Sequence, residues 1–311
     1  MKLFRIFAGA AALLAFVQVV LGSWVRINGA GMTCPDWPLC HGAVVPQLIG
    51  GVVLEWTHRA TALAVGFAIF AAFVTGWRVR HEISGVGPAL LALVAAFVLQ
   101  VIAGGVTIHE SNSPPSVVLH WACAMVLLVT LTVLAVLARE SPRADSGLPE
   151  LRPGACVPGI AFVALLAYLT MCIGSYVSSS GAGLACATFP SCDGTLIVAT
   201  TAQWAQMLHR AVAVLFIFSA LVVALFVAQN GMARVRAWVF AGTGFALLQG
   251  VLGMTNVVLR MPSLLREAHA ANATLTFIAF VIATSFAMLD PLPVRSEVSR
   301  PCRTHVNPTS I

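Results

Sequence analysis

Four histidines are the clearest candidates for chemistry in this chain. His58, His120, His209 and His269 each lie in a long apolar stretch, a few residues from one end of it. The first two recur as the last two at offsets of 151 and 149 residues. An ionisable side chain inside an apolar segment is costly to bury and usually has a function. The pattern indicates two equivalent pairs of imidazole ligands.

Paired imidazoles point to a metal site of one of two kinds. Two imidazoles on facing helices can hold a haem edge-on inside a helical bundle. A zinc ion needs four close donors, usually including cysteine or carboxylate, and neither pair has an obvious third and fourth. The pairs therefore favour haem, with zinc as the alternative. The remaining histidines fall in loops or tails and are expected to be solvated: His41, His81, His109 and His305.

A carboxylate and two arginines accompany the histidines. Glu55 lies three residues before His58, so both project from one helical face, whereas the matching position in the second half is Gln206. This difference predicts that one half carries out chemistry and the other holds a cofactor; the alternative is that Glu55 is exposed just outside its apolar stretch. Arg59 and Arg210 each follow a histidine directly. Each is a candidate to bind a haem propionate, or a base that reaches to the membrane interface.

Four cysteines form two pairs of equal spacing, Cys34 with Cys40 and Cys186 with Cys192. Both pairs fall between apolar stretches, on the predicted outer side, where bacterial disulfides persist. We expect a structural disulfide in each; the alternative, exchange with a thiol partner, suits Cys34–Cys40 better. The spacing is not the Cys-x-x-Cys of thioredoxin-like enzymes. The other cysteines have no counterpart in the other half and are expected to be unpaired: Cys123, Cys156, Cys172 and Cys302.

The composition predicts that membrane helices position these residues. Of the 311 residues, 59% are apolar and 9% charged, against roughly 25% charged in a soluble domain. This excludes a soluble domain, a disordered chain and, despite the net charge of +6, a basic nucleic-acid binder. A helix needs about 20 apolar residues to cross the hydrocarbon core. Eight stretches qualify: 6–25, 57–77, 86–108, 117–138, 156–177, 204–228, 237–258 and 267–288.

The distribution of basic residues predicts the orientation. An even number of spans places both termini on one side, and 12 of the 17 Lys and Arg residues fall in segments on that side. By the positive-inside rule, both termini are predicted to be cytoplasmic. The four histidines and the paired cysteines then lie toward the outer side of the membrane.

The chain is an internal duplication. Nine residues of Leu21–Cys40 recur 152 positions later in Ile173–Cys192, and further matches follow in order. Each half holds four spans, so both share one orientation, unlike transporters with inverted repeats. We predict an all-α polytopic membrane protein with eight transmembrane helices in two tandem pseudo-symmetric four-helix bundles. The predicted divisions are bundles at 1–138 and 154–290, a cytoplasmic linker at 139–153 and a cytoplasmic tail at 291–311.

These motifs resemble the haem A synthase family. The resemblance covers essentially the whole chain and is carried by GSWVRINGAGMTCPDWPLCHG at 22–42, EWTHR at 55–59, LHWACA at 119–124 and their second-half counterparts. The two loop cysteine pairs look like the type found in Gram-positive bacteria. The resemblance implies a bacterial cell-membrane oxidoreductase for cytochrome oxidase biogenesis. It would oxidise the C8 methyl of haem O to a formyl group through a hydroxymethyl intermediate.

The resemblance also implies individual roles. The substrate haem would be bound by His58 and His120, and a haem b cofactor by the second histidine pair. Glu55 would be catalytic beside the substrate methyl, with water as the source of oxygen. The first cysteine pair would take part in turnover and the second would be structural. A haem O synthase and cytochrome oxidase assembly factors are the expected protein partners.

Two other function classes fit part of the pattern. A di-haem b-type membrane electron carrier explains the four histidines but not the difference between Glu55 and Gln206. A membrane thiol–disulfide oxidoreductase makes the loop cysteines central and gives the histidines no role.

Overall fold

The computed structural model describes residues 1–139 and 156–289 of the chain. Within them, eight long helices confirm the eight predicted spans, and each is apolar enough to cross a membrane. The predicted tail lies outside the described residues, as do most of the predicted linker, Cys302 and His305. The elements are α1 Lys2–Ile27, α2 Gly51–Arg78, α3 Val86–His109, α4 Pro114–Leu137, α5 Val157–Ser179, the short 3-10 helix η1 Ala182–Leu184, α6 Thr201–Asn230, α7 Ala233–Val258 and α8 Ser263–Leu289.

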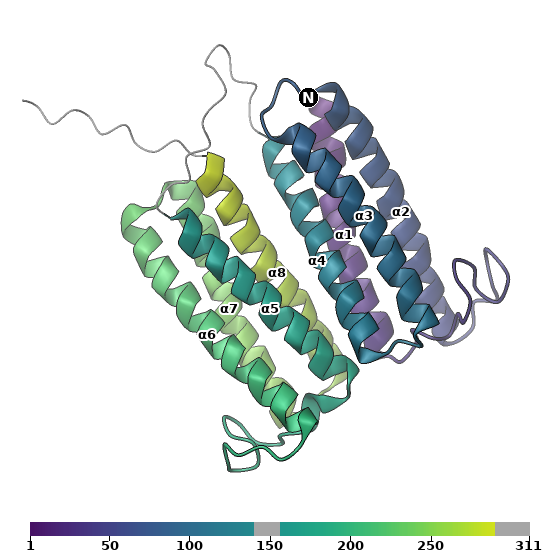
Figure 1. Cartoon of the computed structure of the whole chain (residues 1–311), viewed down its shortest axis with the longest axis vertical. Helices are drawn as coiled ribbons and strands as arrows, with labels where there is room; N and C mark the ends of the chain where they lie inside the picture. Colours follow the sequence, from purple (N-terminus) through teal and green to yellow (C-terminus); the bar gives the residue numbers. More distant parts are fainter. Residues whose placement is uncertain (140–155, 290–311) are drawn as a thin grey trace, which may run out of the picture.

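The helices form two four-helix bundles side by side (Figure 1). In the first, α1 contacts α2, α2 contacts α3, α3 contacts α4, and α4 contacts α1; α5 to α8 repeat this arrangement. The bundles meet through α1 and α4 on one side and α5 and α8 on the other. This confirms the predicted two-bundle architecture and places equivalent helices of the two halves in equivalent positions.

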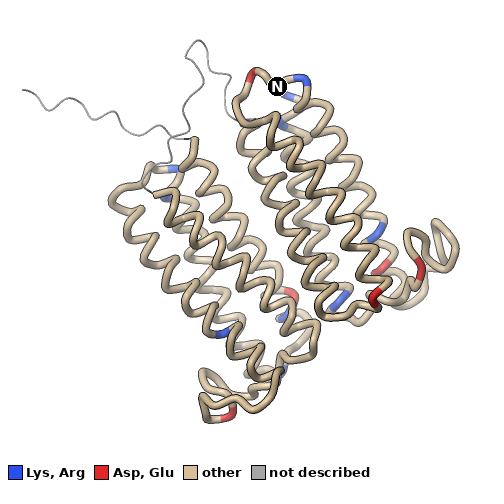
Figure 2. Tube along the Cα trace, in the orientation of Figure 1, with Lys and Arg blue, Asp and Glu red and all other residues tan. Residues whose placement is uncertain are grey.

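The two ends of the molecule differ. We call the end with the loops 28–50 and 180–200 the disulfide end, and these loops the first and second disulfide loops. The opposite end carries the N-terminus. Charged residues gather toward both ends of the helices and leave long uncharged stretches between them (Figure 2). This distribution suits a bilayer, because a charge at its centre is costly.

Helix α2 extends further than its apolar stretch predicts. It begins at Gly51 rather than at 57, because a further apolar turn, Gly51–Leu54, precedes Glu55 and continues the helix. Glu55 therefore lies inside the helix, with only 5% of its surface exposed. The alternative in which Glu55 is an exposed residue outside the span is wrong.

Close packing of small against large residues holds the bundles together. Phe4 of α1 is 1% exposed, and a Cβ atom added at Gly76 of α2 would lie 2.7 Å from its ring. Gly242 and Phe280 form a similar contact in the second bundle. Lipid is as apolar as a leucine side chain, so helix association in a membrane depends on van der Waals packing and small residues. These contacts therefore contribute directly to stability.

Truncating Phe4 tests this packing. Phe4→Ala leaves a cavity between helices, and we expect it to lower the free energy of unfolding by about 3 kcal/mol or more. Thermal unfolding of the purified protein in detergent measures the loss. Phe67→Ala is the matched control, since Phe67 is 68% exposed toward the lipid face. Equal losses in the two variants would contradict the packing argument.

Candidate functional site

The structure places all four predicted histidines at one depth. Each lies in the first third of its helix, α2, α4, α6 or α8, and all four helices begin at the disulfide end. Each ring lies against a glycine of the preceding helix: His58 against Gly22, His120 against Gly104, His209 against Gly174, and His269 against Gly253. A Cβ atom added at these glycines would lie between 2.8 and 3.2 Å from the histidine Cε1. A larger residue there would displace the ring.

Side-chain amides contact three of the histidines. Gln18 Nε2 lies 2.9 Å from His58 Nδ1, and Gln100 Nε2 lies 3.3 Å from His120 Nδ1. Gln249 Nε2 instead donates to the backbone carbonyl of the fourth histidine at 3.0 Å. Such partners fix the orientation of a ligand imidazole. Sequence reasoning missed these roles, although Gln100 and Gln249 recur at the same offset as the histidines that they contact.

The second bundle encloses a cavity of about 370 Å³. Its lining is mainly apolar and includes His209, His269 and the glycines against which they lie. His269 Nδ1 is buried and has no hydrogen-bond partner among the described residues. Nowhere in residues 1–139 and 156–289 do three His, Cys, Asp or Glu side chains come together as a set able to hold a bare metal ion. An apolar cavity with two imidazoles fits a haem, which supplies the other metal ligands itself.

In the first bundle, His58 and His120 lie near each other, as do His209 and His269 in the second. Glu55 is three residues from His58 on the same helix, and Arg59 Nε donates to its Oε1 at 3.0 Å. The structure thus brings a buried, ion-paired carboxylate close to the first histidine pair.

Arg59 also holds the first disulfide loop. Its Nη atoms donate to the carbonyl oxygens of Cys34 at 2.8 Å, Asp36 at 2.6 Å, and Leu39. One guanidinium therefore joins Glu55 to the backbone on both sides of the loop. A planar fork with five N–H donors suits such a role.

Arg210 repeats this arrangement in the second half. It donates to the carbonyl oxygens of Cys186 at 3.0 Å, Thr188 at 2.8 Å and Ser191 at 3.0 Å. These residues match the three carbonyl partners of Arg59 at an offset of 152. The propionate role predicted for both arginines stays a prediction; the structure gives most of their donors to the loops.

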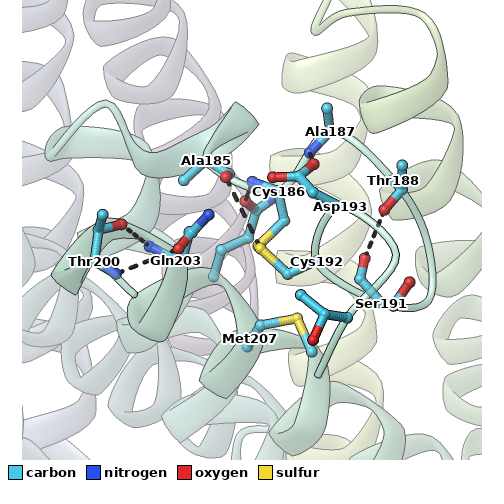
Figure 3. The surroundings of a disulfide bond; sticks show 12 residues. Ala185, Cys186, Ala187, Thr188, Ser191, Cys192, Asp193, Thr200, Gln203 and Met207 are labelled. Carbon is cyan, nitrogen blue, oxygen red and sulfur yellow. Dashed lines mark hydrogen bonds between the residues drawn. A yellow bond between two sulfur atoms is a disulfide. The ribbon is translucent and has the colours of Figure 1, made fainter. Parts of the chain in front are cut away.

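Both predicted disulfides are present, Cys34–Cys40 and Cys186–Cys192 (Figure 3 shows the second). The first loop is tightened by Asp36, whose carboxylate accepts from the N–H groups of Gly42 at 2.8 Å and His41 at 2.6 Å. These bonds, led by the one from Gly42, hold the pKa of Asp36 below its ordinary value. The described remaining cysteines are free, as predicted: Cys123, Cys156 and Cys172.

Gln206, which matches Glu55 in the second half, binds the backbone of the second disulfide loop. Gln206 Oε1 accepts from the N–H of Cys186 at 2.6 Å, and its Nε2 donates to the carbonyl of Gly183 at 2.8 Å. The amide is therefore a structural support for the second disulfide loop. A glutamate cannot replace it, because an ionised carboxylate has no hydrogen to donate.

In the first half, a different residue makes the hydrogen bond that Gln206 Nε2 makes in the second. Gly31 matches Gly183, and its carbonyl accepts from Asn112 Nδ2 at 2.9 Å. At the position that matches Asn112, the second half has Met261, whose methyl lies against Gly183. Asn112 thus takes over the donor role, so Glu55 is not needed to support the first disulfide loop. Sequence reasoning missed Asn112, because the compensation comes from a different helix connection and leaves no local signal.

The fold and site define a polytopic membrane protein with two duplicated pairs of partly buried histidines, one pair in each four-helix bundle. The family model of the cytochrome oxidase assembly protein COX15-CtaA matches residues 5–49 and 51–281, and the chain belongs to this haem A synthase family. Similar proteins include the haem A synthase of Exiguobacterium sp., 29% identical over 94% of this chain and 92% of the relative. Those of Shouchella clausii (27%; 93% and 94%) and Bacillus pumilus (26%; 81% and 85%) are also similar.

Replacing Arg210 tests the loop anchor. Lysine keeps the charge but loses the fork, so Arg210→Lys frees carbonyls of the second disulfide loop. We expect Cys186–Cys192 to be reduced several-fold faster by dithiothreitol, as followed by alkylation and mass spectrometry. Arg260→Lys is the control, because Arg260 is an exposed residue at the same end of the molecule. Unchanged reduction in Arg210→Lys would contradict the anchoring role.

Proposed function

We propose that the chain acts as a haem A synthase, a membrane oxidoreductase that converts haem O to haem A. The C8 methyl of haem O is oxidised to a hydroxymethyl and then to a formyl group, with water as the source of oxygen; each stage releases two electrons and two protons, and an external electron acceptor takes the electrons. The family model, which covers most of the chain, supports this activity, as do relatives named haem A synthase that align over more than nine-tenths of their length. The observation that carries the proposal is that Glu55 stands where the second half has Gln206, although both halves share the histidine pair and the arginine that binds the disulfide loop.

The two bundles have different tasks. Residues 1–138 hold the substrate haem between His58 and His120, and residues 154–290 hold a haem b between the second histidine pair. The apolar cavity of the second bundle and the unpartnered Nδ1 of His269 support the cofactor site. A haem b bound there would supply one-electron redox chemistry. The residues of the chain supply the ligands, the orientation and the exclusion of water.

Glu55 accepts the proton that leaves the substrate methyl. Its burial and its place one helical turn from His58 support this role, because a general base must lie close to the proton that it removes. Arg59 fixes the carboxylate at 3.0 Å and balances its charge. The neutral Gln206 cannot act as a base, which assigns the chemistry to the first bundle.

The two disulfides differ in task as well. Cys34–Cys40 takes part in turnover; the hydrogen bonds by which Arg59 joins Glu55 to the carbonyl of Cys34 support this role. Cys186–Cys192 is linked to Gln206 and Arg210 and is structural.

We further infer the orientation and the partners. Among the described residues, the end of the molecule that carries the N-terminus holds Lys2, Arg5, Arg78, Arg80, Arg139, Arg234 and Arg236. The positive-inside rule makes this end cytoplasmic in the bacterial cell membrane and leaves the disulfides on the oxidising side. Residues 139–153 and 291–311 are then a cytoplasmic linker and tail. A haem O synthase supplies the substrate, and cytochrome oxidase assembly factors receive the product.

Removing the proton acceptor tests the activity. In Glu55→Gln the side chain keeps its shape but no longer takes a proton, and general-base catalysis typically contributes at least 10²-fold. We expect conversion of haem O to fall by about that factor in cells that supply haem O, as measured by chromatography of extracted haems. Glu110→Gln, an exposed residue of the same half, is the control. Haem b alone in wild type and variant would instead favour an electron carrier.

The glycines test the division between bundles. In Gly174→Ala the added Cβ would lie 2.9 Å from His209 Cε1, so we expect loss of haem b with the substrate haem retained. Gly22→Ala, with its Cβ 2.8 Å from His58, should give the opposite result. The haem content of purified protein, separated by type, measures both. Gly244→Ala is the control, since nothing lies within 4 Å of its Cβ position. Loss of the same haem in both variants would contradict the division.

A further inference from the structure

A side chain of the first bundle lines the cavity of the second. Arg26, in the last turn of α1, is part of that lining together with Arg266, in the first turn of α8. The two guanidinium groups are close enough to interact electrostatically. Arg26 Nη1 donates to Ser178 Oγ across the bundle interface. Two like charges at the edge of an apolar cavity indicate an anionic occupant.

Two buried donors in the same lining have no acceptor. Arg266 Nε and the indole Nε1 of Trp121 have no hydrogen-bond partner among the described residues. A buried donor left unpaired costs free energy, so native structures pair nearly all of them. A ligand with acceptor oxygens would satisfy both. Trp121 belongs to α4, so the first bundle contributes this donor as well.

The neighbouring carboxylate of Glu267 does not line the cavity. Glu267 interacts electrostatically with Arg26, but it lines a separate groove with Leu21 and Trp24. Arg210 also lines the cavity, with its donors given to the second disulfide loop. Arg26 and Arg266 are therefore the cations available to a ligand in the cavity.

Arg266 is placed to act together with His269. The two residues are three apart on α8 and share a helical face, with the arginine about 4.5 Å nearer the disulfide end. A ligand held at His269 therefore has a cation beside its edge toward the disulfide end. A haem carries two carboxylates on one edge, and guanidinium groups bind carboxylates through paired hydrogen bonds.

The positions that match Arg26 and Arg266 in the other half of the duplication carry no charge. The residue that matches Arg26 is Ser178, at an offset of 152, and the residue that matches Arg266 is Val117, at an offset of 149. The duplication therefore carries a charged pair at the second-bundle cavity and an uncharged pair, Ser178 and Val117, at the matching positions. Charge, as well as Glu55, distinguishes the two halves.

We propose that Arg26 and Arg266 form a carboxylate-binding pair that holds the propionates of the haem in the second bundle. The pair is contributed by both bundles, and its absence from the first favours a ligand that must enter and leave. This inference rests on the proposed function in requiring that the second bundle binds haem. It assigns the retention of the cofactor to two residues outside the histidine pair.

The test compares haem b with its dimethyl ester, which lacks the carboxylate charges. Full-length protein carrying His58→Ala and His120→Ala, produced under haem limitation, confines ligation to the second pair. We expect this protein to bind haem b more tightly than the ester, in a titration followed by the haem absorption band. Arg26→Gln and Arg266→Gln should each weaken haem b binding about tenfold or more. Binding of the ester should stay the same, and Arg260→Gln should change neither.

Each other outcome overturns the inference. An equal loss for haem b and the ester would make the arginines merely structural, and no loss would remove them from the site. If added phosphatidylglycerol abolishes the preference for haem b over the ester, the arginines bind a lipid headgroup instead. If the protein with both arginines intact binds no haem, the proposed cofactor site fails and the inference with it. Should a glutamine variant not fold, the lysine variants should show a smaller loss for haem b alone.

Discussion

The contact between a histidine ring and a glycine on the preceding helix is the constraint on which this structure depends. It occurs four times, between α1 and α2, α3 and α4, α5 and α6, and α7 and α8. At each place the two helices approach until an imidazole fills the space of an absent side chain. These close pairs then assemble into bundles with the rings facing inward. Each glycine therefore lets two helices pack closely in a bilayer, where the hydrophobic effect does not drive helices together. The same glycine also fixes the position of the histidine ring.

A second constraint is that loop carbonyls near the membrane must be paired. Arg59 and Arg210 bind equivalent sets of carbonyl groups, so the two disulfide loops have nearly the same fold. The two halves nevertheless differ at the position of Glu55 and Gln206. The exchange of Gln206 for Glu55 removes a donor from the first loop, and Asn112 restores it from another connection. In the first half, Asn112 supports the disulfide loop and Glu55 is available for the proposed proton transfer. In the second half, Gln206 itself supports the loop.

Much of this was predictable from sequence, for reasons specific to membrane proteins. Apolar length gave the eight helices, and the repeat gave the bundles and the histidine pairs. The cysteine spacing gave both disulfides. The start of α2 was missed, because Glu55 separates its apolar first turn, Gly51–Leu54, from the long apolar stretch that follows. The loop-anchoring role of Arg59 was also missed, because backbone carbonyls leave no trace in sequence. Arg26 lines the cavity of the second bundle only because of how the two bundles pack together, and the sequence pattern of neither half predicts that packing.

Arg26 belongs to the first bundle but lines the cavity of the second, which has a consequence for the origin of the protein. A four-helix ancestor that paired with its own copy would have offered the same arginine to its partner's cavity, so two identical sites would each have depended on the dimer. In the joined chain the two positions can differ, and they do: one is Arg26 and its counterpart is Ser178. A separately produced second half would consequently fold around an incomplete site, and complementation by the first half would be needed to restore it.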